Sequence, residues 1–371
     1  MRFGVIGGSL GGLITAHALR ANGFPVEIYE RSTGSVKLRG AGMGLQELLA
    51  DYVRENGIAD PVEITTKTLT RKVFDQTGVL ISEQPLVQST TSWEALRKAF
   101  MQVTPPETLH RGFTLQSFEQ SGLGVELNFE NGETRRVDFL VAADGVNSAS
   151  RLQLLGREPT YAGYVAWRGV VDEADAPTSA IEMLENSSAF CRIPHSLFLA
   201  YLIPGPNASV SRGGRYLNWV WYRRVPSGKA LDDVMADKYG SRREFSVPEG
   251  LANEQALAEL RLVGSRDLPA AFAEILAATA NPFLQPIIDF DLDQMAYGRT
   301  ALVGDAAFVI RPHTAASTYK AAVDGISLAR SLGRAAEPER ALASWEAEQV
   351  AFGKNLLRSG QAAGKSIMGQ G

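Results

Sequence analysis

Three acidic residues each follow a short apolar stretch, and they are the first candidates for chemistry in this sequence. Glu30 ends the stretch 26–30, Asp144 follows the stretch 139–143, and Asp305 comes after Thr300 to Gly304. A carboxylate at the carboxyl end of a buried strand is well placed to accept hydrogen bonds from the hydroxyls of a bound sugar. The three acids therefore indicate a ligand-binding edge in an α/β sheet.

A glycine-rich turn precedes the first of these acids. Gly7, Gly11 and Gly12 surround Ser9 and Leu10, in a GxSxxG variant of the GxGxxG pattern. Glycines permit the tight turn and the close packing of the next helix, whose N-terminus then attracts a pyrophosphate. Serine is small and its hydroxyl can donate to a phosphate oxygen, so we interpret it as a tolerated variant. The turn predicts a dinucleotide site, with the acid at residue 30 accepting from the adenosine ribose.

The turn requires a strand on each side and a helix between them. Residues 3–6 form a short apolar run that is typical of a buried parallel strand. Leu13, Ala16 and Leu19 recur at helical spacing, and Gly23 stands where a helix C-cap is expected. A second strand over 26–30 completes a β-turn-α-β unit.

A second glycine-rich stretch, residues 39–44, leaves two interpretations open. The glycines around Gly42 and Met43 indicate either a mobile loop or a backbone segment that lies along the ring system of a bound cofactor. Asp144-Gly145 and Gly304-Asp305 each end a predicted strand, at 139–143 and 300–303.

The middle of the chain has a different residue pattern, with aromatic-rich stretches at 161–171, 196–203 and 216–225. These stretches predict an antiparallel sheet with an apolar pocket. Trp219 and Trp221 fall on one face of a strand; core packing and contact with a substrate are both open for them. The other expected elements are a hairpin over 65–82, a meander over 113–137, and helices at 45–56, 92–100, 231–239, from 248 onward, 268–279, 318–332 and 341–357.

The composition sets the outer limits. The 371 residues suffice for two domains, and 45% hydrophobic with 21% charged residues is ordinary for a globular protein. A net charge of −4 gives no footprint for nucleic acid or an anionic membrane. The single cysteine, Cys191, excludes an intramolecular disulfide, and the four histidines are too scattered to predict a metal site. Without a signal peptide or a long apolar run, a cytoplasmic location is expected.

Together the motifs resemble the flavin-dependent aromatic hydroxylases typified by para-hydroxybenzoate hydroxylase, over essentially the whole chain. The resemblance is carried by the 7–12 turn with Glu30-Arg31, by Asp144-Gly145, and by Gly304-Asp305-Ala306-Ala307, in the order of that family. Segments 161–169, 218–223 and 304–316 look most like the 2,6-dihydroxypyridine 3-hydroxylase group.

The resemblance implies FAD as cofactor and a Rossmann-like FAD-binding domain with an inserted antiparallel-sheet domain for the substrate. It assigns Glu30 and Arg31 to the adenosine end, Asp305 to the ribityl chain, and Asp144-Gly145 to a segment serving FAD and the pyridine nucleotide. Further cofactor contacts are implied at Gly42, Met43, Pro312, Ala315 and Ala316, the last two within the backbone run 314–317 against the flavin pyrimidine. The FAD-binding segments would be 1–70, 101–160 and 283–371, and the substrate-binding segments 71–100 and 161–282.

In that family NADH or NADPH reduces the flavin, O₂ adds to its C4a carbon, and the hydroperoxide hydroxylates an electron-rich ring. His313 is a candidate for the base that deprotonates the ring hydroxyl, although a hydrogen-bonded loop histidine is the simpler interpretation. Trp93 stands where the family has a flavin-contacting arginine, and Ala315 and Ser317 replace a glycine pair. These positions, with Ser9, depart from the family pattern at the finer FAD contacts.

Other functions remain open from the sequence. An epoxidase would share every FAD motif, and a non-catalytic FAD-binding protein would bind flavin without substrate-stimulated NAD(P)H consumption. A halogenase is disfavoured, because the stretch 219–223 lacks the Ile-Pro that completes the halogenase pattern. The ring substrate, the preference for NADH or NADPH, and a homodimer as oligomeric state also stay open.

Overall fold

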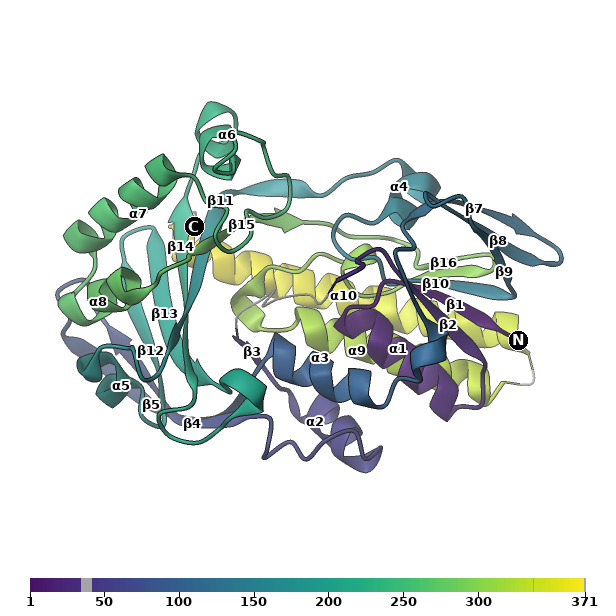
Figure 1. The fold of residues 1–371 in the computed structure, drawn as a ribbon, viewed down its shortest axis with the longest axis horizontal. Coiled ribbons are helices and arrows are strands. Elements are labelled where there is room, and N and C mark those ends of the chain that lie inside the picture. The colour runs from purple at the N-terminus through teal and green to yellow at the C-terminus, as the bar shows by residue number, and fades with distance from the viewer. Residues whose placement is uncertain (35–41, 336, 370–371) are drawn as a thin grey trace. The chain divides into compact units, whose positions relative to one another are not determined.

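The computed structural model describes residues 1–34, 42–335 and 337–369 and has two compact units (Figure 1). The first unit joins Met1–Lys37, Arg97–Thr160 and Ile288–Ala363, and the second joins Leu38–Leu96, Tyr161–Ile287 and Gly364–Gly371. The expected α/β class with an inserted antiparallel sheet is confirmed. The assignment of one set of segments to the cofactor and the other to the substrate stays a prediction.

The first unit is built on a six-stranded sheet in the order β16-β17-β10-β1-β2-β6. Its strands are β16 (Ala296–Tyr297), β17 (Thr300–Leu302), β10 (Phe139–Ala142), β1 (Phe3–Ile6), β2 (Val26–Glu30) and β6 (Leu109–Arg111). All neighbours are parallel except β16, which is antiparallel to β17. The two central strands are apolar at nearly every position and buried throughout, since both sheet faces are covered.

Two helices of the first unit lie side by side, α1 (Leu10–Ala21) and α9 (Ser317–Gly333) (Figure 1). They approach so closely that a Cβ on Gly325 would lie 2.1 Å from Thr15 Oγ1. The long α10 (Pro338–Met368) packs on α9, where the indole of Trp345 donates to the Asp324 carbonyl at 3.1 Å. These contacts fix the N-termini of α1 and α9 against the sheet.

Two smaller parts complete the first unit. The predicted meander is confirmed as the antiparallel sheet of β7 (Leu115–Ser121), β8 (Gly124–Phe129) and β9 (Thr134–Val137). The short helix α4 (Ala149–Leu155) contacts β7. Helix α3 (Trp93–Gln102), whose residues from Arg97 onward belong to the first unit, begins where expected, because Ser92 Oγ accepts from the Ala95 amide at 3.1 Å.

The second unit is an eight-stranded sheet in the order β15-β11-β14-β13-β12-β4-β5-β3. Its strands are β15 (Phe283–Asp289), β11 (Thr160–Asp172), β14 (Tyr216–Arg224), β13 (Ser196–Ile203), β12 (Ser187–Ile193), β4 (Thr66–Phe74), β5 (Leu80–Ser92) and β3 (Gly42–Gly44). The assigned pairs are antiparallel except β12 with β4, which run parallel.

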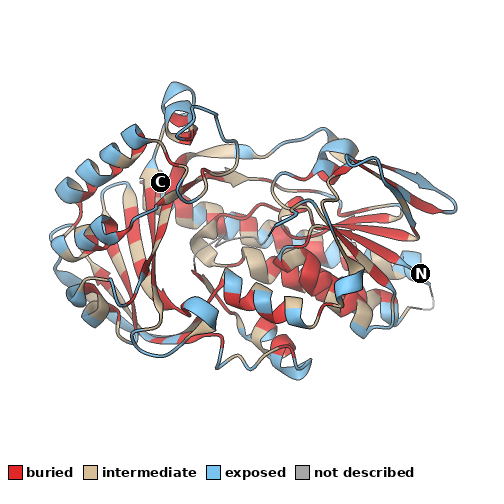
Figure 2. Cartoon of the chain, in the orientation of Figure 1, coloured by how far each residue is buried: buried red, intermediate tan, exposed pale blue. Residues whose placement is uncertain are grey.

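One face of this sheet is covered by α5 (Thr178–Leu184), α7 (Glu254–Asp267) and α8 (Ala270–Ala278), whose apolar residues join one hydrophobic core cluster with the strands. Figure 2 shows these helices buried toward the strands and exposed on their outer sides. We call this side the helix-covered face. Because strand residues alternate, every second residue of β11, β13 and β14 points to the other side, which we call the second face.

Most predicted elements are confirmed, with a few shifted ends. The helix expected from residue 248 begins only at Glu254, because the Asn253 side chain accepts from the Ala256 amide at 2.8 Å and sets the start. The hairpin expected to end at 82 runs on through β5 to Ser92. The remaining helices are α2 (Glu47–Glu55) and α6 (Lys229–Met235).

Candidate active site

The glycine-rich turn lies at the carboxyl edge of the parallel sheet in the first unit. Gly7 has a φ of +109°, and a Cβ there would lie 2.4 Å from the Ala143 carbonyl oxygen. A Cβ on Gly12 would lie 1.8 Å from the carbonyl oxygen of Gly7. Neither position can hold a side chain, so the backbone is close-packed as the dinucleotide pattern requires.

The turn leads into the N-terminus of α1. Ser9 is its N-cap and makes no capping hydrogen bond with its side chain. The first amides, from Leu10 to Gly12, have no acceptor within the helix, so the positive end of the helix dipole is available to an anion. An exposed serine hydroxyl beside these amides fits the interpretation of Ser9 as a tolerated variant.

Glu30 ends β2 beside this turn, and its carboxylate organises the loop. One oxygen accepts from the Gly8 amide at 2.6 Å and the other from the Ser32 amide at 2.8 Å. Each carboxylate oxygen keeps a second lone pair, so a ribose hydroxyl can still donate to it. The neighbouring Arg31 is exposed.

Asp144 follows β10 at the same sheet edge, but its carboxylate is occupied within the protein. It accepts from Ser148 Oγ at 2.6 Å and from the Ser150 amide at 3.0 Å. Burial raises the pKa of Asp144, and the hydrogen bond from Ser148 opposes that rise. The side chain thus holds the start of α4, while Gly145 has a φ of +79° and no heavy atom of the described residues within 4 Å of an added Cβ, which leaves its surface open.

Arg151, which is not among the predicted site residues, links two of the predicted motifs. One Nη donates to the carbonyl oxygens of Asp305 and Ala306 at 3.1 and 3.3 Å, and the other donates to the Val146 carbonyl at 2.5 Å. The side chain is 3% exposed and lies over the Phe290 ring. No local pattern marks this arginine, since the two segments that it joins are far apart in the chain.

Asp305 lies in a 3-10 turn, Gly304–Ala306, directly after β17. Below it, the Gly304 amide donates to Asp324 at 2.9 Å, and Asp324 pairs with the buried Lys320. Burial raises the pKa of Asp305 to about 6, against the nearby charges of Arg151 and Lys320. Hydroxyl groups that donate hydrogen bonds to such a half-buried carboxylate stabilise its charged form, and the hydroxyls of a ribityl chain are donors of this kind.

The segment before α9 brings three predicted residues to the same edge. Pro312–Thr314 is a 3-10 turn, Ala315 follows with a φ of +51°, and Ala316 caps α9. A left-handed conformation favours glycine, which explains why a glycine suits position 315. Thr314 Oγ1 is buried and has no hydrogen-bond partner among the described residues, so this segment offers a polar group to a ligand.

His313 is half-buried in that segment. Burial lowers its pKa to about 4, and the charge of Arg311 acts in the same direction. Arg311 itself makes two hydrogen bonds to Asp289, at 2.9 and 2.6 Å. His313 is therefore a neutral imidazole at pH 7 and a weak proton acceptor, which reduces the support for a role as base.

In the second unit, the two tryptophans share a face, as predicted, and that face is the helix-covered one. Trp219 is 0% and Trp221 1% exposed. Their indole N–H groups donate to Thr279 Oγ1 and Ser196 Oγ, each at 2.8 Å, and Phe198 stacks on Trp219. Both are core residues with satisfied polar groups, so their packing gives no support to contact with a substrate.

Gly42 and Met43 lie in β3, at the edge of the second unit, whereas residues 39–41 of the same stretch lie outside the described residues. Gly42 approaches β13 closely: a Cβ there would be 2.5 Å from Ile203 Cγ2. Its amide donates to Asn218 Oδ1 at 2.9 Å, and its carbonyl accepts from Tyr201 Oη at 2.8 Å. The glycine serves this packing; its predicted contact with the flavin ring stays a prediction.

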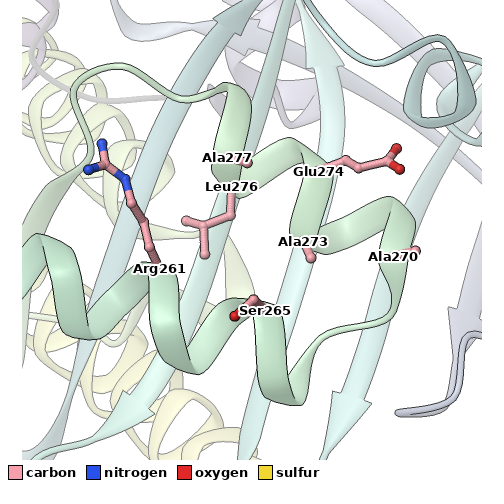
Figure 3. A pocket seen from close by; sticks show the side chains of 7 residues that line it. All are labelled: Arg261, Ser265, Ala270, Ala273, Glu274, Leu276 and Ala277. Atoms are coloured by element: carbon pink, nitrogen blue, oxygen red, sulfur yellow. The ribbon is translucent and has the colours of Figure 1, made fainter.

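A separate hollow of about 300 Å³ lies between α7 and α8 (Figure 3). Arg261 and Ser265 line it from α7, and Glu274 with several alanines lines it from α8. Within the described ranges no group of histidine, cysteine and acidic residues could hold a metal ion. No helix in the described part of the chain is long and apolar enough to cross a membrane.

Known proteins with similar sequences identify the family of this chain. A family described as FAD binding domain-like matches residues 161–289. The 2,6-dihydroxypyridine 3-monooxygenase of Paenarthrobacter nicotinovorans is 32% identical over 96% of this chain and 89% of its own. This chain belongs to the FAD-dependent aromatic hydroxylases. FAD is the cofactor of these monooxygenases and NAD(P)H their co-substrate.

Other relatives agree with this placement. The 6-hydroxynicotinate 3-monooxygenase of Pseudomonas fluorescens is 26% identical over 96% of this chain and 89% of its own. The solved structure of 2,6-dihydroxypyridine-3-hydroxylase from Arthrobacter nicotinovorans superposes with a TM-score of 0.95 at 30% identity, covering 100% of this hydroxylase and 93% of that chain. HpxO from Klebsiella pneumoniae, solved with FAD and uric acid, shares the fold at a TM-score of 0.80 and 21% identity, over 100% and 89%.

The residues at the sheet edge of the first unit fit FAD. The close-packed glycines 7 and 12, the open amides of α1 and the carboxylate of Glu30 match the needs of an adenosine diphosphate. The raised pKa of Asp305 and the buried Thr314 hydroxyl match the needs of a polar chain and ring edge. The sequence-based signals found most of these groups; Arg151, Lys320 and Asp324, which hold them in place, carry no such signal.

Proposed function

We propose that this hydroxylase uses NAD(P)H and O₂ to hydroxylate a small, electron-rich ring that already carries a hydroxyl group, either an aromatic or an N-heteroaromatic ring. One observation carries the proposal: the 32% identity to a dihydroxypyridine monooxygenase extends over 96% of the chain and thus over both units. A relative that shared only the dinucleotide turn would say nothing about the substrate. The similarity to 6-hydroxynicotinate 3-monooxygenase supports the same substrate class.

In this proposal the first unit holds the cofactor. The amides of Leu10 to Gly12 bind the pyrophosphate, Glu30 the ribose, and Asp305 the ribityl hydroxyls. Pro312, Ala315 and Ala316 present backbone groups to the flavin, and Gly145 with its open surface serves the pyridine nucleotide. FAD, when bound, supplies the redox chemistry that activates O₂ and hydroxylates the ring.

The protein's own contribution is binding, orientation and the exclusion of water. A ring hydroxyl activates its ortho and para carbons most strongly when it is deprotonated or donates a strong hydrogen bond. Neutral His313 can accept such a hydrogen bond but holds a proton poorly at neutral pH. We therefore propose that His313 only orients the substrate.

We also propose that the enzyme is cytoplasmic, that its partners are the small aromatic substrate and O₂, and that it assembles as a homodimer.

The test is oxygen uptake and NAD(P)H oxidation with a panel of hydroxylated pyridines and phenols, followed by mass analysis of the product formed under ¹⁸O₂. A true substrate gives one hydroxylated product per nicotinamide, with the new oxygen from O₂. The matching methyl ether, which lacks the free hydroxyl, releases hydrogen peroxide at most. Product oxygen from water, or no ring compound that raises NAD(P)H oxidation above background, refutes the proposal.

A further inference from the structure

The second face of the sheet in the second unit carries a small group of polar side chains among apolar ones. Arg168 on β11, Asn218 on β14 and Tyr201 on β13 all alternate away from the tryptophan core. Asn218 is directly opposite Tyr201 in the β13–β14 pair and opposite Val170 in the β11–β14 pair. Arg168 therefore lies diagonally across from Asn218, within reach of its long side chain.

Two buried donors in this group have no acceptor of regular hydrogen-bond geometry among the described residues. Asn218 is 0% exposed, and its Oδ1 accepts from the Gly42 amide at 2.9 Å, while Nδ2 has no partner among the described residues. Arg168 Nη1 donates to Gln285 at 3.0 Å, but its buried Nε is likewise without an acceptor in the described part of the chain. Leaving two such donors buried and unsatisfied is costly, so an acceptor is expected here.

The surroundings show what kind of acceptor fits. Arg168 is always charged, and its field opposes the burial that raises the pKa of Tyr201. On the β14 side of Arg168 the neighbours are apolar: Val220 lies opposite it and Leu199 lies opposite Val220. Val220 belongs to a buried cluster that includes Met368, and Leu199 packs against that cluster. A permanent positive charge and an amide donor beside apolar side chains match a ring that carries a negatively charged or strongly accepting oxygen.

We propose that Arg168 and Asn218 form a subsite for an anionic oxygen of the aromatic substrate. Its chemical class is a ring oxyanion, as in an ionised hydroxypyridine, or a ring carboxylate. The subsite rests on the function proposed above and narrows it, because the positive charge selects the acidic members of the substrate class. Binding the ring as its anion also raises its electron density and replaces the need for a strong base.

The experiment is a titration of the FAD-loaded enzyme, with binding followed as a change in flavin absorbance. Three probes separate the cases: 2,6-dihydroxypyridine for a ring oxygen, nicotinate for a carboxylate, and 2,6-dimethoxypyridine as a neutral ring of the same shape. Two variants address the subsite. Arg168→Met removes the charge, and Asn218→Asp keeps the acceptor for the Gly42 amide but turns the free donor into an acceptor.

In both variants the dissociation constant of at least one acidic probe should rise about 10- to 100-fold, while that of the dimethoxy probe stays within about twofold. Arg261→Met, an exposed arginine on α7 of the same unit, is the matched control and should change none of the three. FAD content and melting temperature monitor folding. If Arg168→Met does not fold, Asn218→Asp and Arg168→Lys, which keeps the charge, decide the question.

Two failures are distinguishable. If the wild-type enzyme binds the acidic probes and both variants bind them equally well, or lose the neutral probe to the same extent, the subsite is refuted and the proposed function stands. If the wild-type enzyme binds none of the probes and no ring compound raises NAD(P)H oxidation, the proposed function falls, and the subsite falls with it.

Discussion

The two sheets of this hydroxylase carry their polar groups in different places. In the parallel sheet of the first unit they gather at one edge, where β1, β2, β10 and β17 all end. In the mainly antiparallel sheet of the second unit they lie on one face, spread over β11, β13 and β14. Parallel strands send every carboxyl end to the same side, whereas antiparallel strands distribute their ends and share only their faces.

The two units therefore differ in whether the residues that stabilise the fold and those proposed to bind ligands lie in the same place. At the edge, Glu30, the last residue of β2, organises the backbone, and in the proposed function the same carboxylate also binds the ribose. On the antiparallel sheet the two tasks fall on opposite faces: Trp219 belongs to the core, and Asn218, its neighbour in the chain, points the other way. Substitutions should therefore affect stability and ligand binding together at the edge, but separately on the face.

The largest effect is expected from Trp219→Ala. The indole is fully buried and stacked on Phe198, and loss of such a side chain costs about 3–5 kcal/mol of unfolding free energy. Urea denaturation followed by circular dichroism should show this loss. The dissociation constant for FAD in the protein that remains folded should stay unchanged. Equal stability with impaired binding of a ring compound would mean that the helix-covered face also serves the ligand.

Asp305→Ala should mainly affect the cofactor. It removes the hydrogen bond that a ribityl hydroxyl donates to the charged carboxylate, worth about 1.5–3 kcal/mol, or roughly a 10- to 100-fold rise in the dissociation constant for FAD. Equilibrium dialysis of the apoprotein with FAD measures it. Asp305→Asn keeps the shape of the side chain, so its dissociation constant for FAD should lie between those of the wild-type protein and Asp305→Ala. Full FAD occupancy in both Asp305→Ala and Glu30→Ala would contradict the assignment of this edge.

The raised pKa of Asp305 predicts a pH dependence of the apoprotein. The native state holds this proton more tightly than the unfolded chain, because burial raises the pKa from 3.8 to about 6. The free energy of unfolding should then fall as pH rises from about 4 to about 6, by about 1–2 kcal/mol from this group. Asp305→Asn should lack this component when urea curves at several pH values are compared. If the free energies of unfolding of the wild-type protein and of Asp305→Asn depend on pH in the same way, the carboxylate lies in water-like surroundings.

The same contrast between the two sheets explains which site residues could be predicted from the sequence. The edge residues were predictable, because Gly7, Gly12, Glu30 and Asp305 sit in short local patterns next to strands. Arg151 was not, since its three carbonyl acceptors lie at residues 146, 305 and 306 and only the fold brings them together.

On the antiparallel sheet the aromatic pattern predicted the strands and the shared face of the two tryptophans. It could not tell which face the helices cover, because either face of an amphipathic strand can be the buried one. The polar side chains of Arg168, Tyr201 and Asn218 stand on three separate strands. Their common location depends on strand order and register, which alternation along one strand does not contain.

A smaller effect is expected from Thr279→Val, which tests the core face without making a cavity. The Trp219 indole loses its hydrogen-bond acceptor, and a buried unsatisfied N–H costs about 1–2 kcal/mol. The melting temperature should fall slightly, with FAD content and the binding of ring compounds unchanged. Thr279→Ser, which retains the hydroxyl, is the control. A change in ligand binding here would break the separation of the two faces.

The smallest effect is expected from Ser9→Gly at the sheet edge. Glycine is the commoner residue where the backbone approaches a pyrophosphate, and the Ser9 side chain makes no capping hydrogen bond that the change would remove. The dissociation constant for FAD should therefore change by less than tenfold, about 1.4 kcal/mol, as measured by fluorescence quenching of FAD on binding. A glycine at this N-cap costs the helix only a few tenths of a kcal/mol, so the melting temperature of the apoprotein should also stay nearly constant. If FAD binding weakens by more than tenfold while the apoprotein is as stable as before, the hydroxyl is a phosphate ligand. In that case the serine compensates for the missing glycine instead of merely being tolerated, and the edge of the first unit uses a side chain where the GxGxxG pattern uses the backbone alone.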